Sequence, residues 1–222
     1  KWVSPAGSLR LTAAPPVNRG PFPQSMFAQH QYSASVVLNN DNTTGYSPGS
    51  EYAWRLNSLF DPYYGVGGLP DHQPYQFDQV AAIYRQYLVY KVDIQVIVEA
   101  VVGTAPMLCM NVRSGSSTYS LIGGQDPAMI AEKPGCQVFC ATKGATHNTS
   151  VYIADVEGVS RSQIYNDDYF KALINVNPSR TPYLSFVTSS DQGAADVACT
   201  VTMRVNLNFH AQWSQPITAA QS

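Results

Sequence analysis

The side chains that most often carry out chemistry are scattered along this chain of 222 residues. The four histidines stand at positions 30, 72, 147 and 210, and no Gly-x-Ser-x-Gly motif marks a serine nucleophile. The best candidate for acid–base or metal chemistry is His72, with Asp71 beside it and Asp78 shortly after. However, no second histidine stands near it, and Gln73-Pro74 is typical of a turn before a helix that Asp78 would cap. We therefore expect no enzyme activity, no catalytic residue and no cofactor.

Two adjacent carboxylates offer a second kind of chemistry. Asp167 and Asp168 lie in a predicted long loop, and paired carboxylates at subunit junctions can hold calcium through their oxygen atoms. The alternative is an ordinary solvated loop. We favour that alternative and expect no metal ion.

The four cysteines do not have the spacing of a disulfide framework. Cys136 and Cys140 share one face of a predicted strand, about 13 Å apart along it, which is too far for them to bridge each other. Cys109 and Cys199 stand in apolar strand sequences. We interpret all four as reduced, mostly buried thiols that act as small apolar residues in a reducing compartment.

The composition favours a protein that buries much of its outside against neighbouring molecules. Charged residues make up 13% of the chain, about half of the usual share of roughly 25%. Fourteen residues are tyrosine. Interface cores are depleted in charge and enriched in aromatic residues. A secreted β domain is the alternative. The net charge of −2 argues against a polycation, and the absence of a long apolar run argues against a membrane span.

Alternation of apolar and polar residues predicts long strands with one buried face. Every second residue is apolar over 201–212 and over 91–102, so that His210 faces outward if Phe209 faces inward. Weaker patterns predict strands near 32–38, 51–58, 106–113, 135–142, 147–156 and 182–190, and short helices at 78–87 and 160–165. Eight strands with long loops at 59–77, 114–134 and 157–180 are typical of an all-β fold. We predict an eight-stranded antiparallel jelly-roll sandwich of two sheets, with one or two short helices in loops.

The same patterns divide the chain into three parts. We expect an extended arm over 1–28, where prolines are frequent, a jelly-roll domain over 29–213 and a short tail over 214–222. The arm carries Lys1, Trp2, Arg10 and Arg19. The cations could contact phosphates and the indole could stack on an unpaired base, so these four are candidate nucleic-acid contacts. The alternative is an arm that docks on protein.

Residues 56–87 resemble a recurring stretch in the capsid proteins of small circular single-stranded DNA viruses, the circovirus-like (CRESS-DNA) group. Those proteins often carry an Asn-Ser-aromatic-Asp-Pro turn, then His-Gln-Pro, then Asp-Gln, then two tyrosines three apart before a long strand. The matching residues here are Asn57, Ser58, Phe60, Asp61, Pro62, His72, Gln73, Pro74, Asp78, Gln79, Tyr84 and Tyr87, and the predicted long strand follows at 88–102. A weaker echo is Asp167-Asp168-Tyr169 with Asn177-Pro178.

The resemblance implies a structural capsid subunit. Copies would assemble into an icosahedral shell, most simply T=1 with about sixty subunits, around a small circular single-stranded DNA genome. The protein would be found in the virion, and in the host nucleus or cytoplasm during assembly. The resemblance also implies an Arg-rich N-terminal arm, which these residues do not contain, so we expect that arm to precede Lys1.

Two alternatives come from other classes of protein. Similar jelly rolls form the capsids of small RNA viruses. Jelly rolls also form lectins, and Trp54 with Tyr63 and Tyr64 could then stack on sugars. An enzyme such as a cupin would need His and Glu on inward faces, where this sequence has Val, Ile, Leu, Met and Phe. The host receptor is not predicted.

Overall fold

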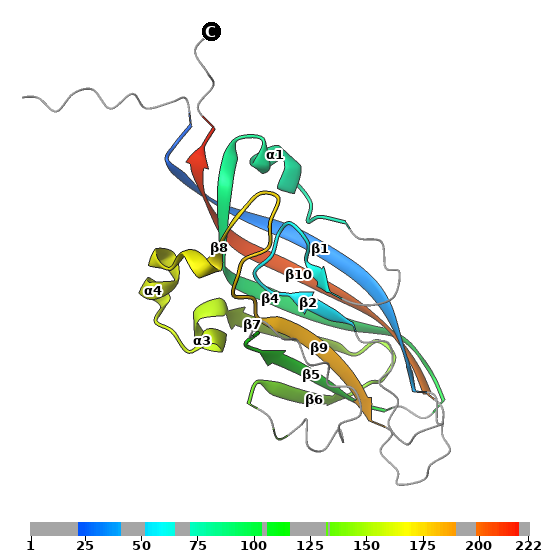
Figure 1. Cartoon of the computed structure of the whole chain (residues 1–222). Helices are drawn as coiled ribbons and strands as arrows, with labels where there is room; N and C mark the ends of the chain where they lie inside the picture. Colours follow the sequence, from blue (N-terminus) through cyan, green and yellow to red (C-terminus); the bar gives the residue numbers. More distant parts are fainter. Residues whose placement is uncertain are drawn as a thin grey trace, which may run out of the picture.

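The computed structural model describes residues 22–40, 52–64, 72–103, 106–115, 132, 134–189 and 199–217. Within these residues, ten strands form two five-stranded antiparallel sheets (Figure 1). Sheet A has the order β1 (Ser25–Asn40), β10 (Cys199–Pro216), β4 (Tyr84–Val102) and β7 (Thr146–Tyr152), and β8 (Lys171–Leu173) also pairs with β4. Sheet B has the order β3 (Tyr63–Tyr64), β2 (Ala53–Arg55), β9 (Tyr183–Ser189), β5 (Met107–Arg113) and β6 (Cys136–Cys140).

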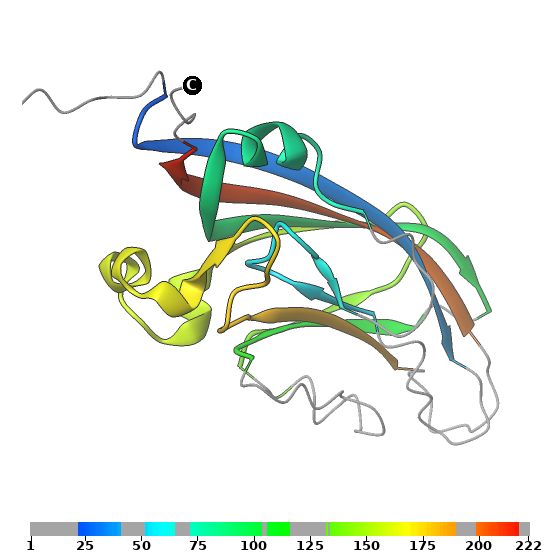
Figure 2. The ribbon, with the colours of Figure 1, turned by 45° about the horizontal axis from the view of Figure 1, so that its top comes forward.

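The strand order is that of a jelly roll. Without the short strands β3 and β8, each sheet keeps four strands, and the chain passes between the sheets as it runs from β1 to β10. The two sheets face each other, and sheet A is long and curved (Figure 2). The predicted all-β fold of two antiparallel sheets is confirmed, with all eight predicted strands present.

Sheet A depends on β10, which pairs along its whole length. It pairs with β1 from Ser214 opposite Ser25 to Cys199 opposite Asn40, and with β4 on its other side. The apolar residues of its alternation face sheet B and are buried. The polar residues between them, His210 included, face away from the core as predicted.

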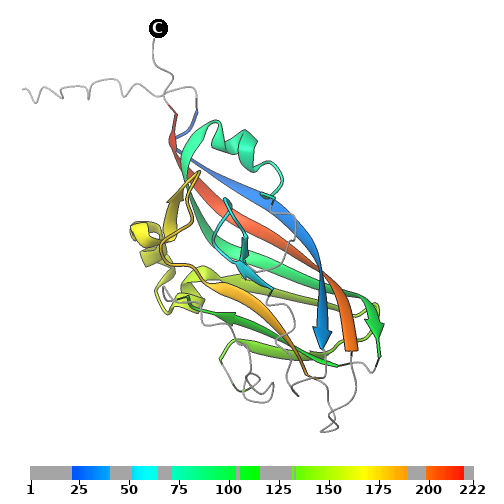
Figure 3. The same ribbon diagram turned by 45° about the vertical axis from the view of Figure 1, so that its right-hand side comes forward.

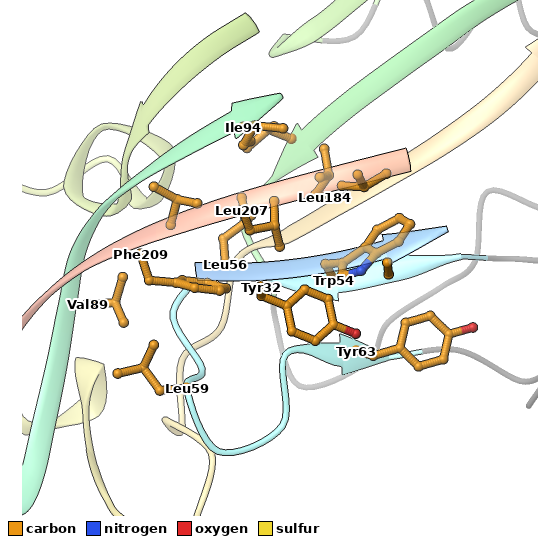
Figure 4. Close-up of a cluster of buried hydrophobic side chains, with 14 of the residues drawn as sticks. Tyr32, Trp54, Leu56, Leu59, Tyr63, Val89, Ile94, Leu184, Leu207 and Phe209 are labelled. Carbon is orange, nitrogen blue, oxygen red and sulfur yellow. The ribbon is translucent and has the colours of Figure 1, made fainter. Parts of the chain in front are cut away.

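The core lies between the sheets and is rich in large rings (Figure 4). Trp54 of β2 contacts Phe186 of β9 edge to face, with ring centroids 5.6 Å apart. Trp213 of β10 contacts Tyr87 of β4 at 5.6 Å. Offset and edge-to-face pairs of this kind add stability beyond the burial of apolar area. Each of these pairs joins two strands of the same sheet, and the buried rings contribute to the core between the sheets.

The helices are short and lie in the connections, as Figure 3 shows. They are α1 (Phe77–Ala81), α3 (Ile153–Glu157), α4 (Arg161–Asn166) and the 3₁₀ helix η1 (Asp168–Phe170). The predicted helix at 160–165 corresponds to α4, with the Ser160 hydroxyl accepting from the backbone of Gln163 at its start. None of the helices in the described residues is long and apolar enough to cross a membrane.

The strand predicted over 51–58 covers only Ala53–Arg55, and two further predicted elements also have the wrong extent. The helix predicted over 78–87 ends at Ala81, because Tyr84 already pairs with Pro216 in sheet A. The strand predicted over 147–156 ends at Tyr152, because the buried residues Ile153 and Ala154 start helix α3. In both places the helical and strand patterns overlap over a few residues, and tertiary pairing decides between them.

The ends of sheet A extend beyond the predicted jelly-roll domain. Strand β1 begins at Ser25 and β10 ends at Pro216, so residues 25–28 and 214–216, assigned above to the arm and the tail, belong to the sheet. Ser25 lies opposite Ser214, which places the two ends of the sheet side by side. The arm residues Lys1, Trp2, Arg10 and Arg19 lie outside the described residues.

The cysteines form no disulfide in the structure. Cys109 and Cys199 are buried, as predicted, whereas Cys140 is exposed because the face of β6 that carries it is uncovered. Burial, together with the nearby Cys136 thiol, raises the pKa of Cys109 to about 11. Cys109 therefore stays protonated at neutral pH.

One buried histidine links β1 to β10 and to the turn before α1. His30 is 1% exposed. Its Nδ1 lies 3.2 Å from the backbone oxygen of Tyr75, and its Nε2 lies 3.0 Å from Nε1 of Trp213. The indole can only donate, so Nε2 accepts and Nδ1 donates, which fixes a neutral imidazole. Burial lowers the pKa of His30 from 6.5, and the hydrogen bond to Tyr75 opposes this only in part.

This arrangement predicts a loss of stability in mild acid. The folded pKa of His30 lies below its unfolded value of 6.5, so the unfolded chain takes up the proton first, and stability falls as pH drops below about 6.5. Urea unfolding midpoints measured between pH 7 and pH 5 should fall steeply for the native chain and less steeply for His30→Gln. The same slope in both proteins would contradict the prediction. His147→Gln is the control, since His147 lies between the sheet edges near the surface.

Candidate functional surfaces

The Asn-Ser-Phe-Asp-Pro stretch is a buried turn. Asn57 and Ser58 are both fully buried. The side chain of Asn57 donates to the backbone oxygen of Arg180 at 2.7 Å. The Ser58 hydroxyl donates to Oδ1 of Asn177 at 2.6 Å and accepts from the backbone nitrogen of Asp61 at 3.1 Å. The turn is therefore fastened to the loop at 176–181, which contains Asn177-Pro178, one part of the weaker echo of the motif.

Asp61 and Pro62 close the hairpin between β2 and β3. The Arg55 guanidinium forms an ion pair with the Asp61 carboxylate and donates to the backbone oxygens of Asp61 and Tyr63 at 2.9 and 3.0 Å. The backbone nitrogen of Arg55 donates to the oxygen of Pro62 at 2.7 Å. Arg55 thus donates to four acceptors in this one turn. The carboxylate of Asp61 is one of them, so it has a structural role.

The two tyrosines of the motif are buried at the start of β4. The Tyr87 hydroxyl donates to the backbone oxygen of Val176 at 3.1 Å and lies 3.4 Å from the backbone nitrogen of Phe60. Burial raises the pKa of Tyr87, and neighbouring hydrogen bonds oppose this in part. The Tyr84 hydroxyl donates to the oxygen of Pro23 at 3.1 Å. The Tyr87 hydroxyl therefore holds two loops against sheet A, and the Tyr84 hydroxyl holds the segment just before β1.

The His-Gln-Pro stretch leads into α1 without forming a reactive cluster. His72 stacks on Tyr32 with ring centroids 4.5 Å apart, and Gln73 donates to the backbone oxygen of Phe60 at 3.3 Å. Pro74 is buried. Asp71 lies outside the described residues. No histidine, cysteine or carboxylate in the described part of the chain belongs to a group of three that could hold a metal ion.

The predicted helix cap at Asp78 is wrong. The residue before α1 is Gln76, which adopts a left-handed conformation (φ 64°) and makes no side-chain cap. Asp78 lies in the first turn of α1, where a negative charge is favourable near the helix N-terminus. Gln79 follows it, and both side chains are exposed. The helix was predicted to start at residue 78, whereas α1 starts one residue earlier, at Phe77.

The paired carboxylates have separate partners. Asp167 accepts from the backbone nitrogen of Tyr169 at 3.0 Å and so caps η1. Asp168 is 88% exposed and pairs with Lys171 at 2.9 Å. These contacts give the two residues structural roles.

The aromatic residues suggested for sugar stacking are core residues. Trp54 is fully buried and Tyr63 is 8% exposed, because both face the interior between the sheets. Tyr64 packs on Tyr183 and under the Arg55 guanidinium. This part of the lectin hypothesis is wrong, since neither Trp54 nor Tyr63 presents a ring face to solvent.

A buried carboxylate inside the predicted loop 157–180 was not anticipated. Glu157, at the end of α3, is 6% exposed. It forms an ion pair with Arg180 and accepts from the Ser114 hydroxyl at 2.8 Å, and Arg180 also donates to its backbone oxygen at 3.1 Å. The contact ties α3 to the same loop that receives Asn57. An acid in a loop gives no sequence signal of this kind, because exposed and buried loop acids look alike.

The outer face of sheet A carries two rows of hydrogen-bonded side chains, and we call it the polar face. In one row, Ser33 of β1 donates to Asn206 of β10, which bonds to Gln95 of β4, which bonds to Asn148 of β7, at 2.6, 2.9 and 3.0 Å. The row crosses all four strands. Such ladders rigidify a sheet and fix its register.

The second row is centred on Asp93. It accepts from Ser150 of β7 at 2.5 Å, from Lys91 at 2.8 Å and from His210 of β10 at 2.6 Å, and Gln29 of β1 contacts His210 at 3.3 Å. Burial by itself raises the pKa of Asp93, but these hydrogen bonds outweigh it and lower the pKa to about 2. The histidine contacts the carboxylate and not the serine, so the arrangement does not activate a nucleophile.

The sequence contains a signal for the polar face. Among the outward positions, 201–212 holds the amides Asn206, Asn208 and Gln212, and 91–102 holds Gln95. Alternation shows which residues face outward, but it does not show which of them meet across strands. That requires the register, which pairs Asn206 with both Ser33 and Gln95.

Solved structures share the jelly-roll fold of this chain. A chain of a semi-empty VLP of the giant freshwater prawn Macrobrachium rosenbergii nodavirus has a TM-score of 0.51 at 9% identity, covering 91% of this chain and 100% of that one. A second structure of the Macrobrachium rosenbergii nodavirus has a TM-score of 0.51 at 11% identity, covering 100% of this chain and 60% of that one.

A decameric BFDV capsid protein has a TM-score of 0.44 at 11% identity, covering 85% of this chain and 99% of that one. No protein-family model and no curated protein matches the chain. At these identities the comparisons show the fold alone.

The buried turn at 57–62 predicts a structural role for the motif. Ser58→Ala would leave Oδ1 of Asn177 and the backbone nitrogen of Asp61 without their partner, and it should lower the free energy of unfolding by about 1–3 kcal/mol. Urea unfolding measures this. Ser35→Ala makes the same change at an exposed site and should stay within about 0.5 kcal/mol. Equal effects would contradict the structural role of Ser58.

Proposed function

We propose that this protein is a structural capsid subunit, which assembles into an icosahedral shell and packages nucleic acid. The observation that carries the proposal is the jelly-roll order of the described strands, together with a likeness to a chain of a nodavirus VLP that covers 91% of this chain and 100% of that one. The side chains that could carry out chemistry support the proposal, because those described above form hydrogen bonds and ion pairs within turns, at helix ends and across sheet A. The proposed location is the virion, with assembly in the host nucleus or cytoplasm.

The finer features of the shell are part of the proposal. The motif resemblance over residues 56–87 supports a single-stranded DNA genome and a T=1 shell of about sixty copies. The fold is equally compatible with the capsid of a small RNA virus. We propose Lys1, Trp2, Arg10 and Arg19 as nucleic-acid contacts, because the three cations suit phosphates and the indole can stack on an unpaired base.

An exposed apolar group is the proposed contact between copies. Tyr169, Leu173 and Val176 are 66%, 49% and 49% exposed, and they belong to η1, β8 and the loop that follows. The backbone nitrogen of Val176 donates to Leu173, and that of Arg180 to Tyr169, which holds the three residues in one folded segment. Contiguous exposed apolar patches often form interaction surfaces, and we propose that these three side chains form one.

Electron microscopy of the expressed full chain tests the function. We expect closed, uniform shells, and nucleic acid that resists nuclease until the shells are opened. Released material that DNase digests would support the single-stranded DNA genome, and material that only RNase digests would support the RNA-virus alternative. A chain that stays monomeric over a range of pH and ionic strength would overturn the proposal.

The apolar contact between copies can be tested by adding charge. The double variant Leu173→Asp with Val176→Asp should stop shell formation, because desolvating the new carboxylates at an interface is costly. Size-exclusion chromatography measures the loss of particles, and circular dichroism checks that the subunit still folds. Val102→Asp is the control, since Val102 is 68% exposed at the opposite end of β4. Shells formed by the double variant as efficiently as by the control would exclude this surface.

A further inference from the structure

Three aromatic rings lie in a row on the outer side of sheet A, and we call them the aromatic stripe: Phe27 of β1, Tyr90 of β4 and Tyr165 of α4. The ring centroids of Phe27 and Tyr90 are 6.0 Å apart, and those of Tyr90 and Tyr165 are 6.2 Å apart. These are the distances of rings in contact. Tyr90 lies at the bulge where β4 passes His210 and Ala211 of β10. The stripe therefore extends from the edge strand across β10 to the helix.

The stripe is open to solvent at both ends. Phe27 is 61% exposed and Tyr165 is 36% exposed. Most large rings of this protein are instead buried between the sheets. Adjoining exposed rings form an apolar surface, and such surfaces often receive a partner. The question is which partner suits this one.

The stripe lies at the end of sheet A where the chain enters the sheet. Strand β1 begins at Ser25, two residues before Phe27. The segment just before β1 is held there, because the Tyr84 hydroxyl donates to the backbone oxygen of Pro23 at 3.1 Å. Residues 1–21 of the sequence precede the described part of the chain at this end. A segment of this chain is therefore tethered close to the stripe.

The sequence before residue 22 contains a stretch that suits aromatic rings. Residues 12–17 are Thr-Ala-Ala-Pro-Pro-Val, without a charge. Proline-rich segments favour the extended polyproline II helix, lose little conformational entropy on binding and dock on surfaces lined with aromatic rings. That helix rises about 3.1 Å per residue. Two of its residues therefore match each step of 6.0 or 6.2 Å between neighbouring rings of the stripe.

The connection between this stretch and β1 is long enough for docking within one chain. Residues 18–24 can span up to about 23–25 Å when extended. Phe27 lies only about 7 Å along β1 from Ser25. The chain can therefore fold back at the end of the sheet and place residues 12–17 over the stripe.

The charges beside the stripe favour an uncharged occupant. Lys91 of β4 pairs with Asp93 at 2.8 Å, and Arg161 of α4 pairs with Asp155 at 3.2 Å. The Arg161 guanidinium also lies over the ring of Tyr152, 3.6 Å from its centroid. Binding of nucleic acid depends on cations that contact phosphates, and these two cations already have carboxylates as partners. The surroundings of the stripe therefore suit an apolar, proline-containing segment better than a polyanion.

We propose that residues 12–17 of the same chain dock on the aromatic stripe, with Pro15 and Pro16 packing on its rings. Docking removes apolar area of both the prolines and the rings from water. It also holds the residues before the segment, Arg10 among them, close to the outer side of sheet A. The proposal does not rest on the proposed function, because one chain carries both the segment and the stripe.

Photocrosslinking of the purified full chain tests the docking. Tyr165 is replaced by the photoreactive residue p-benzoylphenylalanine, the protein is irradiated, and its tryptic peptides are analysed by mass spectrometry. We expect a crosslink to the peptide 11–19, which trypsin releases by cutting after Arg10 and Arg19, in protein that migrates as a single chain. The same probe in place of Val102, which is 68% exposed at the opposite end of β4, should give no crosslink to this peptide.

Variants of both partners show whether the prolines and the rings cause the contact. The double variant Pro15→Ser with Pro16→Ser, and separately Phe27→Ser, should each lower the yield of the crosslink from position 165 about two- to tenfold, as loss of a ring contact predicts. Pro5→Ser lies outside the segment and should leave the yield unchanged. Circular dichroism checks that each variant folds.

Three results would overturn the proposal. They are the absence of a crosslink to the peptide 11–19, a crosslink only to a second chain or to nucleic acid, and an unchanged yield in both the proline and the Phe27 variants. Shell formation is scored separately by microscopy, so the docking and the proposed function can each fail alone.

Discussion

The fold depends on the burial of one face of β10 along its whole length. Every second residue from Val201 to Trp213 is buried between the sheets, and β1 and β4 satisfy the backbone on both sides. A shift of one residue would turn this apolar row to solvent and the polar residues inward. The register is therefore fixed, and with it the positions of all other side chains on sheet A. Both the core and the polar face follow from this single strand.

The motif at 57–87 stabilises the loops that connect the strands. Its buried polar residues, Asn57, Ser58 and Tyr87, all bond to the loop at 176–181. Arg180 extends that loop to α3 through Glu157. The residues that resemble a family motif thus hold two loops together that are far apart in the sequence. Its polar groups are needed because backbone atoms buried in loops must find partners.

Much of the fold could be predicted because alternation is a local property. The strands at 91–102 and 201–212 follow from residue type alone, and turn residues bound the others. What could not be predicted depends on pairing across the chain. Tyr84 is a strand residue because it meets Pro216, and Trp54 is a core residue because the pairing of β2 with β9 turns it toward the interior between the sheets. The diagonal contact of His210 with Asp93 depends on the register and on a bulge.

The adjacent ends of sheet A have a mechanical consequence. Ser25 and Ser214 are neighbours in an antiparallel pair, so a pull that separates the two chain ends acts across the ladder of β1 and β10. Such a load opens the backbone hydrogen bonds one after another, like a zip, instead of straining many of them together in shear. The sheet should therefore resist force weakly in this direction. Tension on the segment before β1 would detach the edge strand first and leave β10 paired with β4.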